Sequence, residues 1–170
     1  TRQSGGRLLA TGILREDALA LVLNRIPPPD ARSLDRALRR LLKRLYGFGV
    51  TSVTDFDGLS AARLYCRLDE PMRILSSVRR NELEEAIAAG VRSGSQLGER
   101  VTAGPLKLFL DGSLGSRTAW MLEPFEGTPS DLGMGLLPRA ELESLSRRAT
   151  AAGLDLALHA IGDRANRAAL

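Results

Sequence analysis

The stretch PLKLFLDGSLGSRTAW, residues 105–120, joins a short apolar run to a segment rich in glycine and serine. Its first part alternates leucine with other side chains, which predicts a β-strand over LKLFL, residues 106–110. Lys107 stands inside this strand, although only two of the 24 basic residues are lysines, Lys43 and Lys107. Since lysine is almost never fully buried without a partner, its place in an apolar strand points to a specific role.

Strands and helices alternate on both sides of this stretch. Ser33 is the expected N-cap of the second helix, and Asn81 with Glu84 forms an expected capping box. The expected helices cover 14–26, 33–46, 59–69, 81–91, 138–153 and the segment from Asp163 onward, and the expected strands cover 50–55, 72–78, 106–110 and 154–160, with a long loop over 111–136. Because strand and helix alternate four times, we expect an α/β fold with a parallel sheet.

Composition excludes several classes of function. The 170 residues are 44% hydrophobic and 26% charged, as in a single globular domain, and no apolar run is long enough to span a membrane. The net charge of +4 comes from scattered arginines interleaved with acids, and aromatic residues make up only 4%, so no nucleic-acid partner is expected. The single cysteine, Cys66, cannot form an internal disulfide, which fits a reducing compartment such as the cytoplasm.

Side-chain parity brings two chemically distinctive residues together. In a strand, alternate residues face opposite sides, so leucines occupy one face of 106–110 and of 154–160. The opposite faces carry Lys107, Phe109 and Asp111 on one strand, and Asp155, Ala157 and His159 on the other. In a β/α barrel that opposite face is the interior, and active sites form where the strands end. We therefore expect Lys107 and His159, the only histidine, to lie near each other at the catalytic end.

Other interpretations of the same residues stay open at this point. An inward histidine is often a hydrogen-bonded core residue, and Lys107 could pair with Asp111 or another acid. The segment DGSLGS, residues 111–116, could bind phosphate at a helix N-terminus, but its glycines fit neither nucleotide-binding pattern and no helix follows at once.

Two long motifs resemble the metal-dependent amidohydrolase superfamily. These are LKLFLDGSLGSRTAWMLEPF, residues 106–125, and GLDLALHAIGDRAN, residues 153–166. The resemblance is to the branch of N-substituted formamide deformylases and exoenzyme-regulatory-type hydrolases, and it extends to TGILREDALALVLNRIPPP, residues 11–29, and GVTSVTDFDG, residues 49–58.

The resemblance implies a (β/α)₈ barrel with a metal centre at its mouth. Lys107 matches the fourth-strand lysine, which carbon dioxide carbamylates, and His159 matches the fifth-strand histidine. Together they are expected to bind a divalent metal, with zinc expected, as one or two ions. Burial favours the neutral amine that carbamylation needs, and arginine could not replace it.

The resemblance also places residues of the long loop at the barrel mouth. Asp111, Gly112 and Arg117 are expected there, with Arg117 either binding a carboxylate or carbonyl of the substrate or fixing the loop. Asp163 would cap the helix that follows it or support His159, and we favour the cap.

Much of the family pattern is missing from this sequence. The family has a His-x-His pair on its first strand, a histidine on its sixth, and a general-base aspartate on its eighth, whereas this chain has one histidine in total. We therefore expect a partial barrel, about strands 2 to 5, within a longer hydrolase. Residues 1–31 would be an N-terminal helical and connecting segment, and 32–170 the incomplete barrel domain, with no catalytic general base in this chain.

The expected function of the parent protein is hydrolysis of a small-molecule amide, or another non-peptide C–N bond, through metal-activated water. The segment alone would be inactive without the remainder of the barrel from the parent chain. Its open sheet edge would favour association, which allows a homo-oligomer, and no membrane partner is expected. The alternative is a non-catalytic α/β binding or regulatory module that keeps the scaffold, and a His-x-His pair upstream would discriminate the two.

Overall fold

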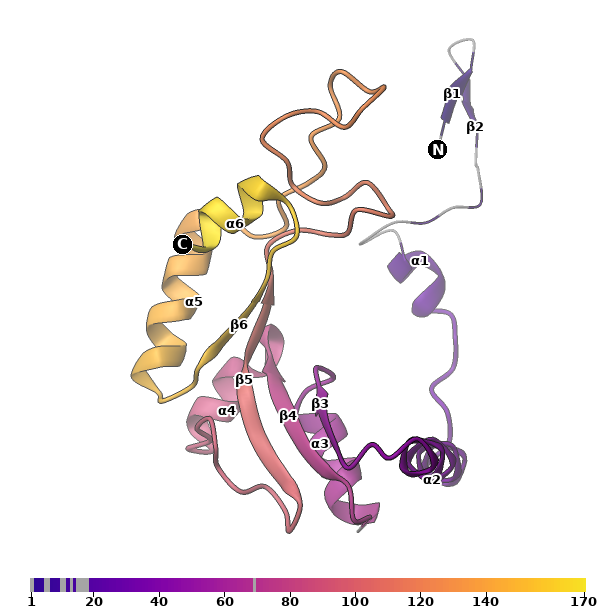
Figure 1. Cartoon of the computed structure of the whole chain (residues 1–170), viewed down its shortest axis with the longest axis vertical. Helices are drawn as coiled ribbons and strands as arrows, with labels where there is room; N and C mark the ends of the chain where they lie inside the picture. Colours follow the sequence, from indigo (N-terminus) through magenta and orange to yellow (C-terminus); the bar gives the residue numbers. More distant parts are fainter. Residues whose placement is uncertain (1, 5–6, 10–11, 13, 15–18, 69) are drawn as a thin grey trace.

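The computed structural model describes residues 2–4, 7–9, 12, 14, 19–68 and 70–170, and its centre is a parallel sheet (Figure 1). Four strands lie in the order β3-β4-β5-β6, which is also their order in the sequence. They are β3 (Ser52–Asp55), β4 (Arg73–Arg79), β5 (Val101–Phe109) and β6 (Leu156–His159). The sheet curls into half of a barrel, which confirms the predicted partial β/α barrel.

Helices follow the strands as the alternating pattern predicts. Four of them are α3 (Leu59–Leu68), α4 (Leu83–Ala88), α5 (Arg139–Ala151) and α6 (Asp163–Ala169), with a short 3₁₀ turn, η2 (Arg80–Glu82), before α4. Two more, α1 (Ala20–Leu23) and α2 (Ala31–Gly47), precede β3, and a hairpin of β1 (Arg2–Ser4) and β2 (Arg7–Leu9) comes first. Within the described residues, no helix combines the length and the apolarity that crossing a membrane requires.

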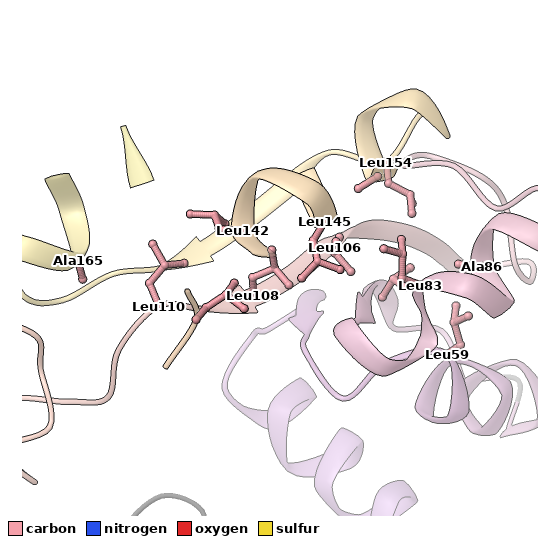
Figure 2. Close-up of a cluster of buried hydrophobic side chains, with 13 residues drawn as sticks. Leu59, Leu83, Ala86, Leu106, Leu108, Leu110, Leu142, Leu145, Leu154 and Ala165 are labelled. Atoms are coloured by element: carbon pink, nitrogen blue, oxygen red, sulfur yellow. The ribbon is translucent and has the colours of Figure 1, made fainter. Parts of the chain in front are cut away.

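The leucine face of β5 is the main core of the molecule (Figure 2). Leu106, Leu108 and Leu110 are each at most 1% exposed and pack against leucines of α4 and α5. Burying one leucine contributes roughly 2 kcal/mol, so this row fixes which face of the strand turns inward. A second cluster joins Leu42 of α2 to Ile74 of β4. The parity predicted for residues 106–110 is confirmed.

The opposite face of the sheet lacks such a cover among the described residues. Phe109 on β5 is 51% exposed and Leu75 on β4 is 36% exposed. Lys107 projects from the same face as Phe109, since both alternate with the buried leucines. The long loop of residues 111–136 leaves β5 at the end of the sheet where β6 also ends (Figure 1).

The predicted caps are wrong in two places. Asp30, not Ser33, is the N-cap of α2: its extended backbone follows the prolines, and its carboxylate accepts from the Ser33 amide at 2.9 Å. Asn81 and Glu84 form no capping box, because residues 80–82 turn as a 3₁₀ helix and Glu82 accepts from the Arg79 amide at 3.1 Å instead. The N-cap of α2 thus lies three residues earlier than predicted, and the capping box starts at Arg79, two residues earlier than Asn81.

Strand and helix lengths also differ from the prediction. β5 begins at Val101, five residues earlier than predicted, because Gly104 lets the chain pass close to Leu75 and Ser76 where β4 has a bulge. β6 covers only Leu156–His159, and α4 ends at Ala88. Of the predicted helix 14–26, the described part is helical over Ala20–Leu23, and residues 15–18 lie outside the described residues.

Candidate metal centre

The register of the sheet places Lys107 and His159 on one face of neighbouring strands. Lys107 pairs with Ala157, and Phe109 pairs with His159, so Lys107 lies one strand across and two residues back from the histidine. From strand geometry, their Cα atoms are then about 8 Å apart. The predicted placement of the two residues on the same face of neighbouring strands is confirmed, and a shared metal ligand stays a prediction.

Two aromatic rings lie close to the Lys107 amine. Its Nζ lies 4.7 Å from the centre of the Phe56 ring, just after β3, and 4.9 Å from that of Phe109. Burial lowers the pKa of the Lys107 amine, and no charged neighbour contributes to that shift. The alternative in which Lys107 forms an ion pair with Asp111 is wrong for the described residues, because the Asp111 carboxylate is held by backbone amides.

His159 is held by the chain that follows β5. Its Nε2 lies 2.9 Å from the Gly112 carbonyl oxygen, and its ring centre lies 5.1 Å from that of Phe109. A carbonyl only accepts, so Nε2 carries the hydrogen and donates it. In the neutral ring, Nδ1 then keeps its lone pair for a ligand. The side chain is 27% exposed, so the ring is reachable from the uncovered face.

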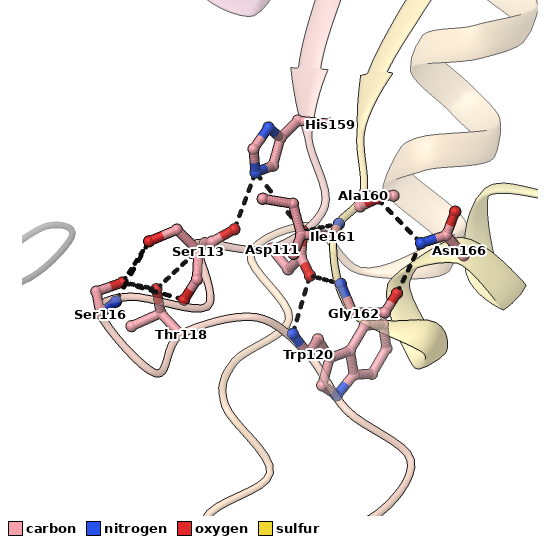
Figure 3. Close-up of polar contacts among 11 residues, drawn as sticks. Asp111, Ser113, Ser116, Thr118, Trp120, His159, Ala160, Ile161, Gly162 and Asn166 are labelled. Atoms are coloured by element: carbon pink, nitrogen blue, oxygen red, sulfur yellow. Dashed lines mark hydrogen bonds and ion pairs between the residues drawn. The ribbon is translucent and has the colours of Figure 1, made fainter. Parts of the chain in front are cut away.

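Asp111 lies behind this contact, fully buried (Figure 3). Its carboxylate accepts three backbone hydrogen bonds, from the amides of Trp120 at 2.9 Å, Ile161 at 3.0 Å and Gly162 at 2.7 Å. These amides belong to the long loop and to the turn after β6. Asp111 therefore faces the protein's own backbone, whereas the sequence placed it at the barrel mouth.

The other residues predicted at the barrel mouth, Arg117 and Gly112, also make contacts within the long loop. The Arg117 guanidinium donates to the Glu126 carbonyl at 2.8 Å and lies 5.7 Å from the Phe125 ring centre. This is the loop-fixing contact that the sequence left open, and a substrate contact stays a prediction. The Gly112 amide donates to the Thr118 carbonyl at 3.1 Å, while its own carbonyl holds His159.

Asp163 begins α6 but is not its N-cap. The N-cap is Gly162, and the Asp163 carboxylate accepts from the Leu122 amide at 2.7 Å and the Arg164 amide at 2.8 Å. The predicted cap is wrong because the carboxylate turns toward the long loop, which needs an acceptor for Leu122. Its side chain has no hydrogen bond to His159 among the described contacts.

Gly162 is required by a close approach of two backbones. A Cβ at this position would overlap the Trp120 backbone, although the φ of Gly162, −67°, suits any residue. We expect Gly162→Ala to destabilise the full-length protein that carries this chain by about 3 kcal/mol, because the loop must move away from the turn. Gly115→Ala, in the same loop with open space around it, should change stability by less than about 0.5 kcal/mol. Thermal or urea unfolding measures both, and equal effects would contradict the contact.

Several residues of this arrangement were missed by the sequence. The alternation had already placed Phe109 on the face of Lys107, whereas Phe56, which follows a predicted strand, was not singled out. Nothing in the sequence marks the amide of Trp120, which takes part only through its backbone. Glu82, which lies outside this arrangement, was also missed, because its partners lie 23 residues away at Leu59 and three residues away at Arg79.

The donors present fit part of a metal site. In the portion of the chain that the structure describes, no group of three or more His, Cys, Asp and Glu residues could hold an ion. A catalytic zinc site has three protein ligands plus water. Lys107, once carbamylated, and His159 would supply two of them, so further ligands must come from elsewhere.

Comparisons with known proteins agree with this geometry. Residues 2–170 match the model of the Amidohydrolase family. The chain is 31% identical over 165 residues to "Putative amidohydrolase YtcJ" of Bacillus subtilis (strain 168), covering 91% of this chain and 30% of that protein. It is 30% identical over 171 residues to "Protein LONG AFTER FAR-RED 3" of Arabidopsis thaliana, covering 92% of this chain and 29% of that protein.

A solved structure shares the fold over nearly the whole chain. It is an uncharacterized metal-dependent hydrolase from Pyrococcus horikoshii OT3, with a TM-score of 0.79 and 30% identity, and the match covers 99% of this chain and 36% of that one. The chain thus spans about a third of the length of the proteins it matches.

Proposed function

Because this chain belongs to the Amidohydrolase family, we propose that its parent protein hydrolyses a small-molecule amide or another non-peptide C–N bond at a divalent metal centre. The observation that carries the proposal is the position of Lys107 and His159 on the same uncovered face of neighbouring strands, near where the strands end. Family membership supports a hydrolase, and the metal-dependent hydrolase among the structural neighbours supports a divalent metal. The predicted deformylase branch stays a prediction.

We propose that Lys107 acts as a carbamate. Burial among Phe56 and Phe109 shifts the amine toward its neutral form, which has the lone pair that reacts with carbon dioxide. The nitrogen would form a bond to the carbon of carbon dioxide, and one proton would leave to water, which gives an N-carboxylate. That group offers anionic oxygens, the kind of ligand that zinc and similar divalent ions accept.

His159 would be the second ligand from this chain. Its Nε2 hydrogen is directed at the Gly112 carbonyl, so the Nδ1 lone pair is the one available for a metal. When bound, the ion would lower the pKa of a water molecule and polarise the scissile carbonyl. The rings of Phe56 and Phe109 lie beside the Lys107 amine and would help to position its side chain for the reaction with carbon dioxide.

Removal of the metal tests this function. We expect the full-length protein to lose at least about 100-fold in amide hydrolysis after dialysis against a chelator and to regain activity with zinc or another divalent ion. The assay would follow amine release from a panel of N-acyl and N-formyl amides, with metal content measured by elemental analysis. A metal-free protein that retains full activity would contradict the proposal. Bound metal without hydrolysis of any amide would favour the non-catalytic module instead.

A further inference from the structure

We infer that Asp111 is a positioning residue for His159, rather than a residue that contacts substrate. The inference rests on the proposed function, since it matters to the chemistry only if His159 is a metal ligand. Three features of the structure carry it: the burial of Asp111, the identity of its partners, and the contacts that its two neighbours in the chain make with the histidine.

The burial and the partners of Asp111 indicate that its carboxylate holds backbone segments together. Its side chain is 0% exposed, and both carboxylate oxygens accept backbone hydrogens. Oδ1 accepts from Ile161, and Oδ2 accepts from Gly162 and Trp120. A buried carboxylate is costly unless it is hydrogen-bonded, and amide donors to an ionised acceptor are among the stronger hydrogen bonds. A substrate could not reach these oxygens without breaking those bonds.

The two residues beside Asp111 in the chain both contact His159, one at its backbone and one at its ring. The Leu110 amide donates to the His159 carbonyl at 2.9 Å, and the Gly112 carbonyl accepts from Nε2 at 2.9 Å. Asp111 lies between these two residues and also accepts from the amides of Ile161 and Gly162, two and three residues after the histidine. The Asp111 Oδ1 lies 3.9 Å from Nε2, which is too far for a hydrogen bond. Asp111 thus sets the ring orientation through the backbone on both sides.

The chain offers a matched control in Glu82. Its carboxylate also accepts from three backbone amides, those of Leu59 at 3.0 Å, Ser60 at 3.4 Å and Arg79 at 3.1 Å. It ties the start of α3 to the end of β4, where Arg79 pairs with Lys107 in the sheet register, and it makes no contact with His159. Glu82→Gln and Asp111→Asn therefore remove the same kind of anchor, and only the second lies beside the histidine.

The experiment compares metal affinity and stability of the two variants in the full-length protein. Both should lower the melting temperature, because an amide offers one acceptor oxygen where the carboxylate had two. Only Asp111→Asn should weaken zinc binding, by about 10- to 100-fold in competition with a chromogenic chelator. Glu82→Gln should stay within about threefold of wild type. Equal losses of zinc affinity in the two variants, or none in Asp111→Asn, would overturn the inference.

Two further measurements separate the possible failures. If His159→Gln leaves zinc affinity unchanged, the proposed function fails; if His159→Gln weakens it and Asp111→Asn does not, only the positioning role fails. If Asp111→Asn does not fold, nitrogen NMR of the metal-free wild type still tests which ring nitrogen of His159 carries the hydrogen. The His159 signals are assigned by their loss in His159→Gln. The neutral ring should carry its hydrogen on Nε2. A hydrogen on Nδ1 would show that Gly112 does not hold the ring, and the inference would fall.

Discussion

Replacing Lys107 with alanine is expected to lower kcat/KM of the full-length protein by at least about 10³-fold, or roughly 4 kcal/mol of transition-state stabilisation. The metal should be lost in parallel, because the carbamate oxygens disappear with the amine. Lys107→Arg should fare no better, although it restores length and charge, because a guanidinium stays protonated and cannot react with carbon dioxide. Kinetics and metal analysis on both variants provide the measurement.

The chain supplies a direct control for this experiment. Lys43, the only other lysine, lies exposed on α2, and Lys43→Ala should leave activity and metal content unchanged. In the wild-type protein, labelled bicarbonate should give a carbamate carbon signal by NMR that is absent from Lys107→Arg and present in Lys43→Ala. Full activity of Lys107→Ala would remove Lys107 from the site and leave it as a lysine packed between two phenylalanines.

Substitution of His159 should have the second-largest effect and should depend on which atom is kept. The side-chain amide of asparagine ends near the position of Nδ1, whereas that of glutamine reaches the position of Nε2. Since Nε2 donates to the Gly112 carbonyl, we propose Nδ1 as the ligand. His159→Gln should then cost at least about 10³-fold in kcat/KM, and His159→Asn about tenfold less, because an oxygen ligand remains.

Zinc affinity of the two variants checks the assignment independently of turnover. The order expected is wild type, then His159→Asn, then His159→Gln. The reverse order would identify Nε2 as the ligand and would mean that the contact with Gly112 breaks when metal binds. Equal and unchanged affinities would show that His159 is a hydrogen-bonded core residue, the other interpretation that its position in the sequence allows.

The fold was largely predictable because period-2 alternation is a local property of the chain. LKLFL and LDLALHA each carry leucines on one face, and the β5 leucines are buried. The same alternation placed Lys107 and His159 together. Caps were less predictable: Asp30 and Ser33 both suit an N-cap, and the choice depends on which backbone turns first after the prolines.

The role of Asp111 could not be predicted from the sequence. Two of its three partners lie 50 and 51 residues away, at Ile161 and Gly162, and all three take part through backbone amides, which every residue except proline has. An aspartate at a strand end, before a glycine, also fits a residue that faces substrate. Only the folded backbone shows that the carboxylate turns inward.

The close contact of Gly162 with Trp120 bears on how variants of this protein could be made. The long loop after β5 is held to the turn after β6 by the amides of Trp120 and Leu122, which donate to Asp111 and Asp163. A loop transplanted from a relative would therefore have to match the carboxylates and the turn of this protein, unless the turn after β6 were transplanted with it. Residues 111–136 and 159–163 form one exchangeable cassette, although 22 residues of helix and strand separate them in the gene. Libraries of variants should vary the loop tip, residues 123–130, and keep both ends of the cassette unchanged.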